Sequence, residues 1–159
     1  DSAGKLHVWG HDLNRQVSFK PSLAAGVVWR AVAAGRCHTA AIDSAGELHV
    51  WGQDVFGQAS KKPSLAAGVV WRAVAAGRCH TAAIDSAGEL HVWGRDPGGQ
   101  ASKKPSLAAG VVWRAVAAGR CHTAAIDSAG KLHVWGHDLN RQVSFKPSLA
   151  AGVVWRAVA

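Results

Sequence analysis

The chain has 159 residues, is 48% hydrophobic and carries a formal net charge of +8. This size and composition are typical of about one globular domain and exclude an intrinsically disordered chain. No apolar run reaches the roughly 18 residues of a membrane span, and the first residues do not resemble a signal peptide, so we expect neither. The excess of Lys and Arg favours acidic partners, nucleic acid among them, without determining the fold.

A period of 42 residues runs through the whole chain. The segment AAGRCHTAAIDSAGELHVWG occupies residues 33–52, recurs at 75–94, and returns at 117–136 with Lys131 in place of glutamate. Periods of 20–50 residues are typical of solenoids, propellers and arrays, in which each unit buries its apolar faces on its neighbours. We therefore divide the chain into repeats 1–42, 43–84 and 85–126 and a partial repeat, 127–159.

Each repeat predicts four short strands. In chain order, VVWRAVA (27–33) is rich in β-branched and aromatic residues, and CHTAAI (37–42) and ELHVWG (47–52) flank the turn DSAGE (43–47), which predicts a hairpin. We expect a fourth, edge strand in QASKKPSLAA (58–67), because Pro63 cannot donate to a ladder. Four strands in about 42 residues are typical of a β-propeller blade. A helical repeat would need two longer amphipathic runs, which the sequence lacks.

The repeat also resembles a known family. The segment VAAGRCHTAAIDSAGELHVWGQDVFGQ (32–58) is similar to the repeat of the regulator of chromosome condensation family, with its Gly and His-Thr, its Asp-Ser-x-Gly hairpin, its Trp-Gly and its closing Gly-Gln. The resemblance implies an all-β propeller of about seven four-stranded blades that is usually intracellular and serves as a protein-interaction platform. The chain departs from the pattern at Arg15 and Arg141, which replace the glycine, and all four loops are short, so we expect those loops to differ in shape from the family norm.

The number and likeness of the repeats lead to two further expectations. Residues 1–159 would form a single propeller segment too short to close a ring, so closure would come from a longer chain or from association with another copy. Residues 1–33 are identical to 127–159, and 43–84 differ from 85–126 only at 53/95, 55/97 and 56/98. Such near-identity indicates recent duplication or deliberate design.

Adjacent Cys and His residues in each repeat raise the question of a metal site. Neighbouring residues on a strand point to opposite faces, so one Cys-His pair cannot chelate one ion, and we predict no metal and no cofactor. We expect Cys37, Cys79 and Cys121 to be small buried thiols of a reducing compartment. The family resemblance implies that His38, His80 and His122 are structural and hydrogen-bonded across blades. Residues 7, 49, 91 and 133, also histidines, share a sheet face with tryptophan, and we expect them to pack between blades.

Catalysis and light sensing are both disfavoured. Ser, His and Asp recur in every copy, whereas catalysis needs one unique constellation, so we predict no enzyme. The plant ultraviolet-B photoreceptor of the same family carries a Gly-Trp-Arg-His-Thr motif, but this chain has Gly-Arg-Cys-His-Thr at 35–39. Its eight tryptophans are better explained as apolar wedges between blades.

Arginine and the variable loops remain as candidate binding residues. In the resembled family the turn before the His-Thr strand opens onto one propeller face, so Arg36, Arg78 and Arg120 would form an arc of donors suited to carboxylate or phosphate. A solvated or blade-bridging role is the alternative. The copies vary mostly in the loop after Trp-Gly, where we expect partner contacts at His11, Asn14, Arg15, Gln53, Phe56, Arg95, His137 and Arg141.

The sequence therefore predicts a non-catalytic, intracellular propeller scaffold. It would bind protein, itself included, and an acidic surface or nucleic acid, but no membrane. Two alternatives stay open: a regulatory factor directed at chromatin or a small GTPase, of the guanine nucleotide exchange type, and a propeller lectin. The short, uniform loops speak against the first, since an exchange factor needs a unique inserted wedge.

Overall fold

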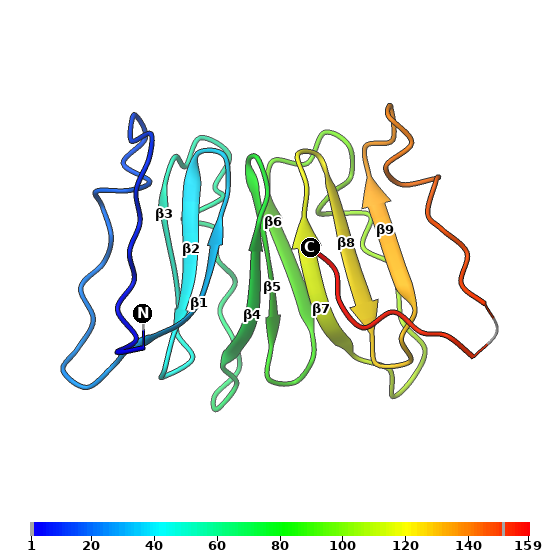
Figure 1. The fold of residues 1–159 in the computed structure, drawn as a ribbon, viewed down its shortest axis with the longest axis horizontal. Coiled ribbons are helices and arrows are strands. Elements are labelled where there is room, and N and C mark those ends of the chain that lie inside the picture. The colour runs from blue at the N-terminus through cyan, green and yellow to red at the C-terminus, as the bar shows by residue number, and fades with distance from the viewer. Residues whose placement is uncertain (1, 151) are drawn as a thin grey trace.

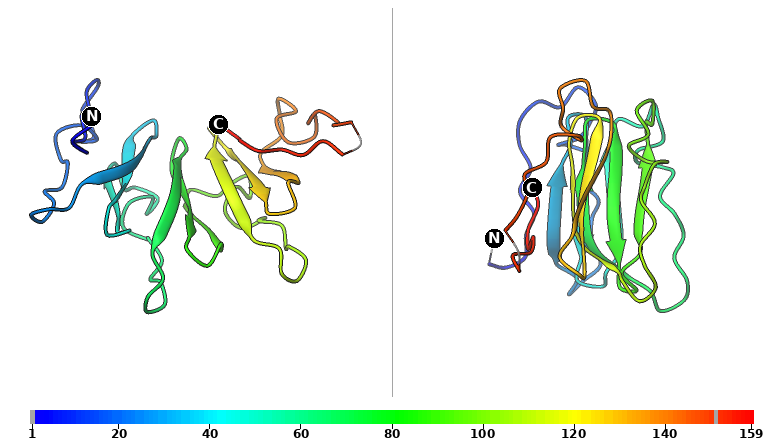
Figure 2. Two further views of the ribbon diagram at one scale, coloured as in Figure 1. Left: turned by 60° about the horizontal axis from the view of Figure 1, so that its bottom comes forward. Right: turned by 90° about the vertical axis from the view of Figure 1, so that its right-hand side faces the viewer.

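Three antiparallel sheets of three strands each make up the regular structure of the described residues, 2–150 and 152–159 of the computed structural model. The first blade contains β1 (Trp29–Ala34), β2 (His38–Asp43) and β3 (Leu48–Gly52); the second contains β4 (Trp71–Ala76), β5 (His80–Asp85) and β6 (Leu90–Gly94); the third contains β7 (Trp113–Ala118), β8 (His122–Asp127) and β9 (Leu132–Gly136). Figures 1 and 2 show the blades as a fan that forms an open arc. The predicted all-β propeller architecture is confirmed.

The predicted hairpin between the second and third strands of each blade is confirmed. In the first blade β2 pairs with β3 in continuous register, and the Gly46 amide donates to the Asp43 carbonyl at 3.0 Å. The Asp43 carboxylate also accepts from the backbone amides of Ala45 and Glu47. Gly46 has φ +79°, and a Cβ there would meet the Val70 side chain at 2.6 Å, so glycine is needed for both conformation and space.

The first strand of each blade lines the concave edge of the arc. β1 packs against β4, and β4 packs against β7. Each of these strands pairs with the second strand of its own blade through a bulge next to the tryptophan, as between Trp29 and Ala31 in β1. The turns between first and second strands and the loops after the third strands therefore share one end of the propeller, and the hairpins lie at the other end (Figure 1).

The fourth strand expected in residues 58–67 is not confirmed. The described residues of that segment form turns and irregular backbone beside the third strand. Pro63 lacks an amide hydrogen, and the preceding residue attaches by its side chain instead: the Lys62 ammonium donates to the Leu48 carbonyl at 2.7 Å. Lys104 makes the same contact with the Leu90 carbonyl at 2.7 Å in the next repeat. The segment thus covers the blade edge by a side-chain bond and not by a backbone ladder.

Tryptophans form wedges between blades, as predicted. One apolar cluster joins Ala40, Ile42 and Leu48 of the first blade to Trp71, Ala83 and Trp93 of the second, and an equivalent cluster joins the second blade to the third. Trp51, Trp93 and Trp135 are 3–6% exposed. Burying a side chain of this size stabilises the junction by about 2–3 kcal/mol. The histidines at 49, 91 and 133 differ from expectation, because each packs edge-on against the first tryptophan of its own blade at 5.0–5.1 Å between ring centroids.

A polar network crosses each blade junction beside the apolar cluster. The loop after β3 brings the Gln58 carbonyl to the second blade, where it accepts from the Thr81 hydroxyl at 2.9 Å and the Trp93 indole at 3.0 Å. Gln16 and Gln100 serve the first and third blades in the same way. Gln58 is fully buried, so the loop end belongs to the core of the junction.

Histidine completes the network, and the geometry determines its tautomer. The Thr81 hydroxyl gives its one proton to Gln58, so its oxygen must accept from the His38 Nε2–H at 2.9 Å. His80 donates likewise to Thr123 at 3.2 Å, which confirms the predicted cross-blade hydrogen bond. The Nδ1 atom of each ring, which has no hydrogen-bond partner, faces a glycine turn. A Cβ on Gly77 would lie 2.3 Å from His80 Cε1, so only glycine leaves room for the ring.

His80→Ala should lower the free energy of unfolding by on the order of 2 kcal/mol, because it removes a buried hydrogen bond and leaves a cavity. Thermal melts followed by circular dichroism measure the change, and His137→Ala, at an exposed position, is the control and should stay within about 0.5 kcal/mol. An unchanged melting temperature accompanied by loss of a bound metal or ligand would reverse the structural assignment.

The free energy of unfolding should also fall as the pH is lowered from 6.5 to 4. Burial lowers the pKa of both His38 and His80 from 6.5 to about 4, and for His80 the neighbouring His38 and His122 add to the effect. In this window the unfolded chain binds protons that the folded chain excludes, so acidification favours unfolding. Urea denaturation at pH 7, 5.5 and 4.5 measures the slope, and His80→Gln should make it shallower. A free energy of unfolding that is constant across these values would contradict the prediction.

Candidate functional site

The three arginines of the predicted arc lie together at the concave edge. Arg36, Arg78 and Arg120 occupy the turns that follow β1, β4 and β7, and they line one shallow groove of about 430 Å³. The Arg36 amide donates to the Gly77 carbonyl at 3.4 Å, which ties the first of these turns to the second. Arg36 and Arg120 are exposed and Arg78 is half-buried. The structure therefore brings together residues that are 42 positions apart in sequence.

None of these guanidinium groups forms an ion pair with a carboxylate among the described residues. The ion pairs found there join His49 to Asp43, His91 to Asp85 and His133 to Asp127, at 2.8–2.9 Å. Burial opposes the charge on Asp43, but hydrogen bonds from His49, Glu47 and Ala45 outweigh it and keep the pKa of that carboxyl below its ordinary value. These three aspartates are thus held at the hairpin end, away from the arginine arc, and the loop aspartates at the arc's own end accept backbone amides instead.

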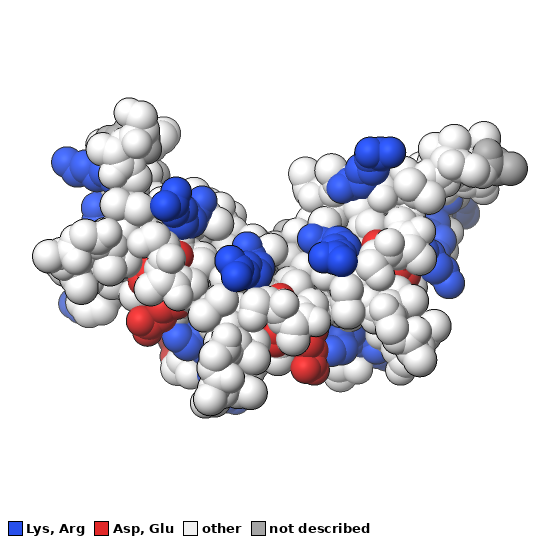
Figure 3. Space-filling model, turned by 90° about the horizontal axis from the view of Figure 1, so that it is seen from below, with Lys and Arg blue, Asp and Glu red and all other residues white. Residues whose placement is uncertain are grey.

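A second row of arginines lies on the same edge and was not predicted from the sequence. Arg30, Arg72 and Arg114 are the second residues of β1, β4 and β7, and all three are exposed. Figure 3, viewed from the hairpin end, shows basic side chains spaced along the concave edge. The pattern VVWRAV holds the signal, because the residue beside a buried tryptophan on a strand points the other way. The concave edge therefore carries two rows of positive charge.

The loops after the third strands share one backbone scheme despite their different sequences. In each, an aspartate carboxylate accepts the amide five residues on, as Asp54 does from Ala59 at 2.8 Å. The glutamine side chain accepts the amide two residues before it, as Gln58 does from Phe56 at 3.0 Å. The same pairs occur at 12–17, 96–101 and 138–143 and at 14–16, 98–100 and 140–142.

The four loops of this chain therefore share one backbone shape, with or without the glycine. Arg15 and Arg141 both have φ +58°, close to the +75° and +79° of Gly57 and Gly99. The left-handed conformation is unfavourable for arginine, but the aspartate and glutamine bonds on either side hold the backbone in it. The loop shape is thus determined by the Asp and Gln positions and not by the glycine.

The loop residues predicted as partner contacts fall into two groups. Asn14 and Gln53 touch each other across neighbouring loops at 3.4 Å, and the Arg95 guanidinium lies 5.1 Å from the centre of the Phe56 ring. These four join one loop to the next. The remaining four, His11, Arg15, His137 and Arg141, are exposed.

The cysteines and the hairpins are the places where a metal would be sought. Cys79 is buried, and burial raises the pKa of its thiol, whereas Cys37 and Cys121 are half-exposed, which corrects the expectation that all three are buried. The hairpin groups Asp43, Glu47, His49 and Asp85, Glu89, His91 bring three ligand atoms within 4.8 Å of one another. In each group the aspartate already binds its histidine and the turn amides, so those contacts belong to the hairpin.

Comparison with known proteins identifies the repeat. Residues 29–58, 71–100 and 113–142 each match the regulator of chromosome condensation (RCC1) repeat. The structure of Prp20p from Saccharomyces cerevisiae is similar with a TM-score of 0.70 and 22% identity, over 88% of this chain and 43% of Prp20p. Yeast RCC1 (Prp20) bound to Kap60 gives 0.64 and 22%, over 80% and 38%, and human WBSCR16 gives 0.59 and 26%, over 72% and 36%.

The coverage values show how much of each solved structure this chain matches. The chain spans about two fifths of the length of the yeast structures that it matches. None of the curated proteins compared with the chain matches it. In the described part of the chain, no helix has the length and apolar character needed to cross a membrane. The three repeat matches and the bladed architecture together show that the chain belongs to the regulator of chromosome condensation repeat family.

Proposed function

We propose that this chain is a non-catalytic, intracellular propeller module that binds an acidic partner along its arginine arc. The supporting observation is the groove lined by Arg36, Arg78 and Arg120, two of them exposed and one half-buried, which form no ion pair with a carboxylate among the described residues. Repetition along the arc makes the site multivalent, so contacts that are weak singly add up for a partner with several negative charges. The exposed row at 30, 72 and 114 extends the same field along the concave edge.

A non-catalytic role is supported by the structural contacts that the histidine, aspartate and serine side chains make. The His–Asp pairs recur in every blade and sit in the hairpins, where the aspartate accepts turn amides. The neighbouring Ser44 hydroxyl accepts the Val28 amide at 3.2 Å, which gives it a role in holding the hairpin. Triad chemistry instead needs one serine hydrogen-bonded to the histidine.

A regulatory role directed at chromatin or a small GTPase is the second candidate. The solved structure of Prp20p is described together with its binding to Gsp1p and histones, and the yeast protein also occurs in a complex with Kap60. Histones are basic, so a basic concave edge favours an acidic protein or nucleic acid over a histone as the partner of this chain. The short, uniform loops again favour a general interaction module.

Replacing Arg36, Arg78 and Arg120 together by Gln should weaken binding to heparin, used as a model polyanion, by at least tenfold at 0.1 M salt, because three convergent charges are lost. The matched control replaces Lys61, Lys103 and Lys131 by Gln, which removes the same net charge from exposed positions. Fluorescence anisotropy over a salt series measures both. Equal losses in the two variants would show that the charge is diffuse, and no loss in either would remove the arc as a binding site.

We further propose that the blades at the two ends bind additional repeats, from a longer chain or from a second copy. Trp9 is 82% exposed, whereas its equivalent Trp51 is 3% exposed. At the other end Leu149 is 39% exposed, whereas its equivalents Leu65 and Leu107 pack against the apolar clusters of the internal junctions. At the internal junctions such faces meet the next blade through one shared set of contacts, so the matching surface is another copy of the same repeat.

The isolated 159-residue chain should therefore associate with itself, because exposed tryptophan and leucine at its ends gain from burial. Native mass spectrometry across a dilution series should show dimers or larger species, and Trp9→Gln should shift them toward monomer. Ser18→Gln, at an exposed position of the same repeat, is the control. A protease-resistant monomer at every concentration would contradict the prediction.

A further inference from the structure

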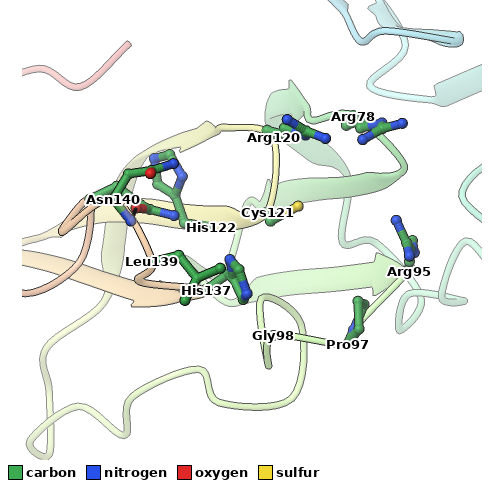
Figure 4. Close-up of a pocket in the computed structure, with 11 residues that line it drawn as sticks. Arg78, Arg95, Pro97, Gly98, Arg120, Cys121, His122, His137, Leu139 and Asn140 are labelled. Atoms are coloured by element: carbon green, nitrogen blue, oxygen red, sulfur yellow. Dashed lines mark hydrogen bonds between the residues drawn. The ribbon is translucent and has the colours of Figure 1, made fainter.

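The junction of the second and third blades contains a cavity that the arginine arc does not account for. It has a volume of about 610 Å³ and lies between the loops that follow β6 and β9, beside the turn before β8. Figure 4 shows Arg78, Arg95 and Arg120 around one side of it and Leu139 on the other. We call this cavity the three-arginine pocket. Its volume is that of a small-molecule site.

The charge of the pocket is unbalanced. None of its lining residues is acidic, and the nearby loop carboxylate, Asp96, accepts the backbone amides of Ala101 and Ser102 at 2.6 and 3.1 Å. Arg78, Arg95 and Arg120 make no ion pair with a carboxylate among the described residues. Three guanidinium groups that share one concave site without a counter-charge repel one another, and an anionic ligand would relieve that repulsion.

The sequence differences between repeats give the pocket at this junction a lining of its own. Where the second blade has Arg95, Pro97 and Gly98, the first blade has Gln53, Val55 and Phe56. The Phe56 ring stacks on the Arg95 guanidinium at 5.1 Å, so the first junction carries an aromatic side chain where the second has Gly98. A Cβ on Gly98 would lie 2.8 Å from the Cβ of His137, so a side chain there would displace the neighbouring loop as well. The same stacking holds the Arg95 guanidinium against the preceding loop.

We propose that the three-arginine pocket binds an organic phosphate monoester. A phosphate dianion offers three terminal oxygens and can accept from several guanidinium groups at once, whereas one carboxylate offers two oxygens and is satisfied by a single bidentate arginine. Pro97 and Leu139 provide apolar surface for the body of the ester. The proposal rests on the proposed function in one respect, because Arg78 and Arg120 belong also to the arginine arc, but Arg95 and the cavity are separate from it.

Alkylation of the cysteines offers a test with an internal control. Cys121 lines the pocket, and the equivalent Cys37 is also half-exposed but lies outside it. After trypsin treatment the two cysteines fall in peptides that end at Lys131 and Lys61, so mass spectrometry distinguishes them. Phenyl phosphate should slow the reaction of Cys121 with iodoacetamide at least threefold and leave Cys37 unchanged, and benzyl alcohol should protect neither.

The matched variant carries the residues of the first blade at the second, R95Q/P97V/G98F. It should weaken phenyl phosphate binding at least tenfold in calorimetry and abolish protection of Cys121, while heparin binding through the arginine arc is retained. Arg95→Gln alone, which leaves the loop backbone untouched, should weaken phenyl phosphate binding in the same direction and keeps the test valid if the triple variant does not fold. If the arginine arc is not a binding site, heparin binding will not depend on its arginines. If the three-arginine pocket is not a binding site, phenyl phosphate binding will not depend on Arg95.

A phosphotyrosine peptide distinguishes the two sources of a phosphate monoester. Peptide binding at least as strong as that of phenyl phosphate assigns the pocket to a phosphorylated side chain of a partner, and weaker binding assigns it to a small molecule. The proposal is overturned if phenyl phosphate gives neither heat nor protection of Cys121, if Cys37 is protected equally, or if the Arg95→Gln protein binds as the parent does.

Discussion

The arrangement of the blades depends on one buried acceptor, the backbone carbonyl of the glutamine that closes each loop. In the second junction the Gln100 carbonyl receives the Thr123 hydroxyl and the Trp135 indole, and the hydroxyl oxygen in turn receives His80. A donor left without this acceptor in the dry junction would lose its hydrogen bond to water with no replacement. The loop is therefore both a surface segment and the polar centre of the interface, so any residue that changes the loop must leave its last carbonyl in place.

Most of the fold could be predicted from the residue pattern, because the strands of a blade follow one another closely in sequence. The same pattern also recurs in each repeat. The hairpin at Asp43 to Glu47 is encoded by neighbours in sequence. The absent fourth strand could not be predicted, since it depends on whether Lys62 reaches the Leu48 carbonyl, which is a contact in space. Likewise the shape of the loop at Arg141 depends on hydrogen bonds to Asp138 and Gln142, which outweigh the local preference of arginine.

The candidate site divides in the same way. The arc of Arg36, Arg78 and Arg120 could be predicted because the repeat places one arginine in each equivalent turn, and a ring of blades brings equivalent turns together. The three-arginine pocket could not, because it combines residues of different repeats and depends on an absent side chain at Gly98. Differences between repeats thus carry information that the repeat itself does not. The variable loop positions are where a uniform scaffold can acquire one distinct site.

The near-identity of the junctions has a consequence for how the chain reaches its native state. The contacts between the first and second blades are chemically the same as those between the second and third, so a blade cannot distinguish its correct neighbour from another by interface energy alone. Order along the arc is imposed instead by the connecting segments, which keep each blade at a high effective concentration beside its neighbour in sequence. Between separate molecules no such tether exists, and exchange of equivalent blades costs little interface energy. Folding at high concentration therefore competes with blade exchange, and dilution during refolding favours the order that the chain connectivity specifies.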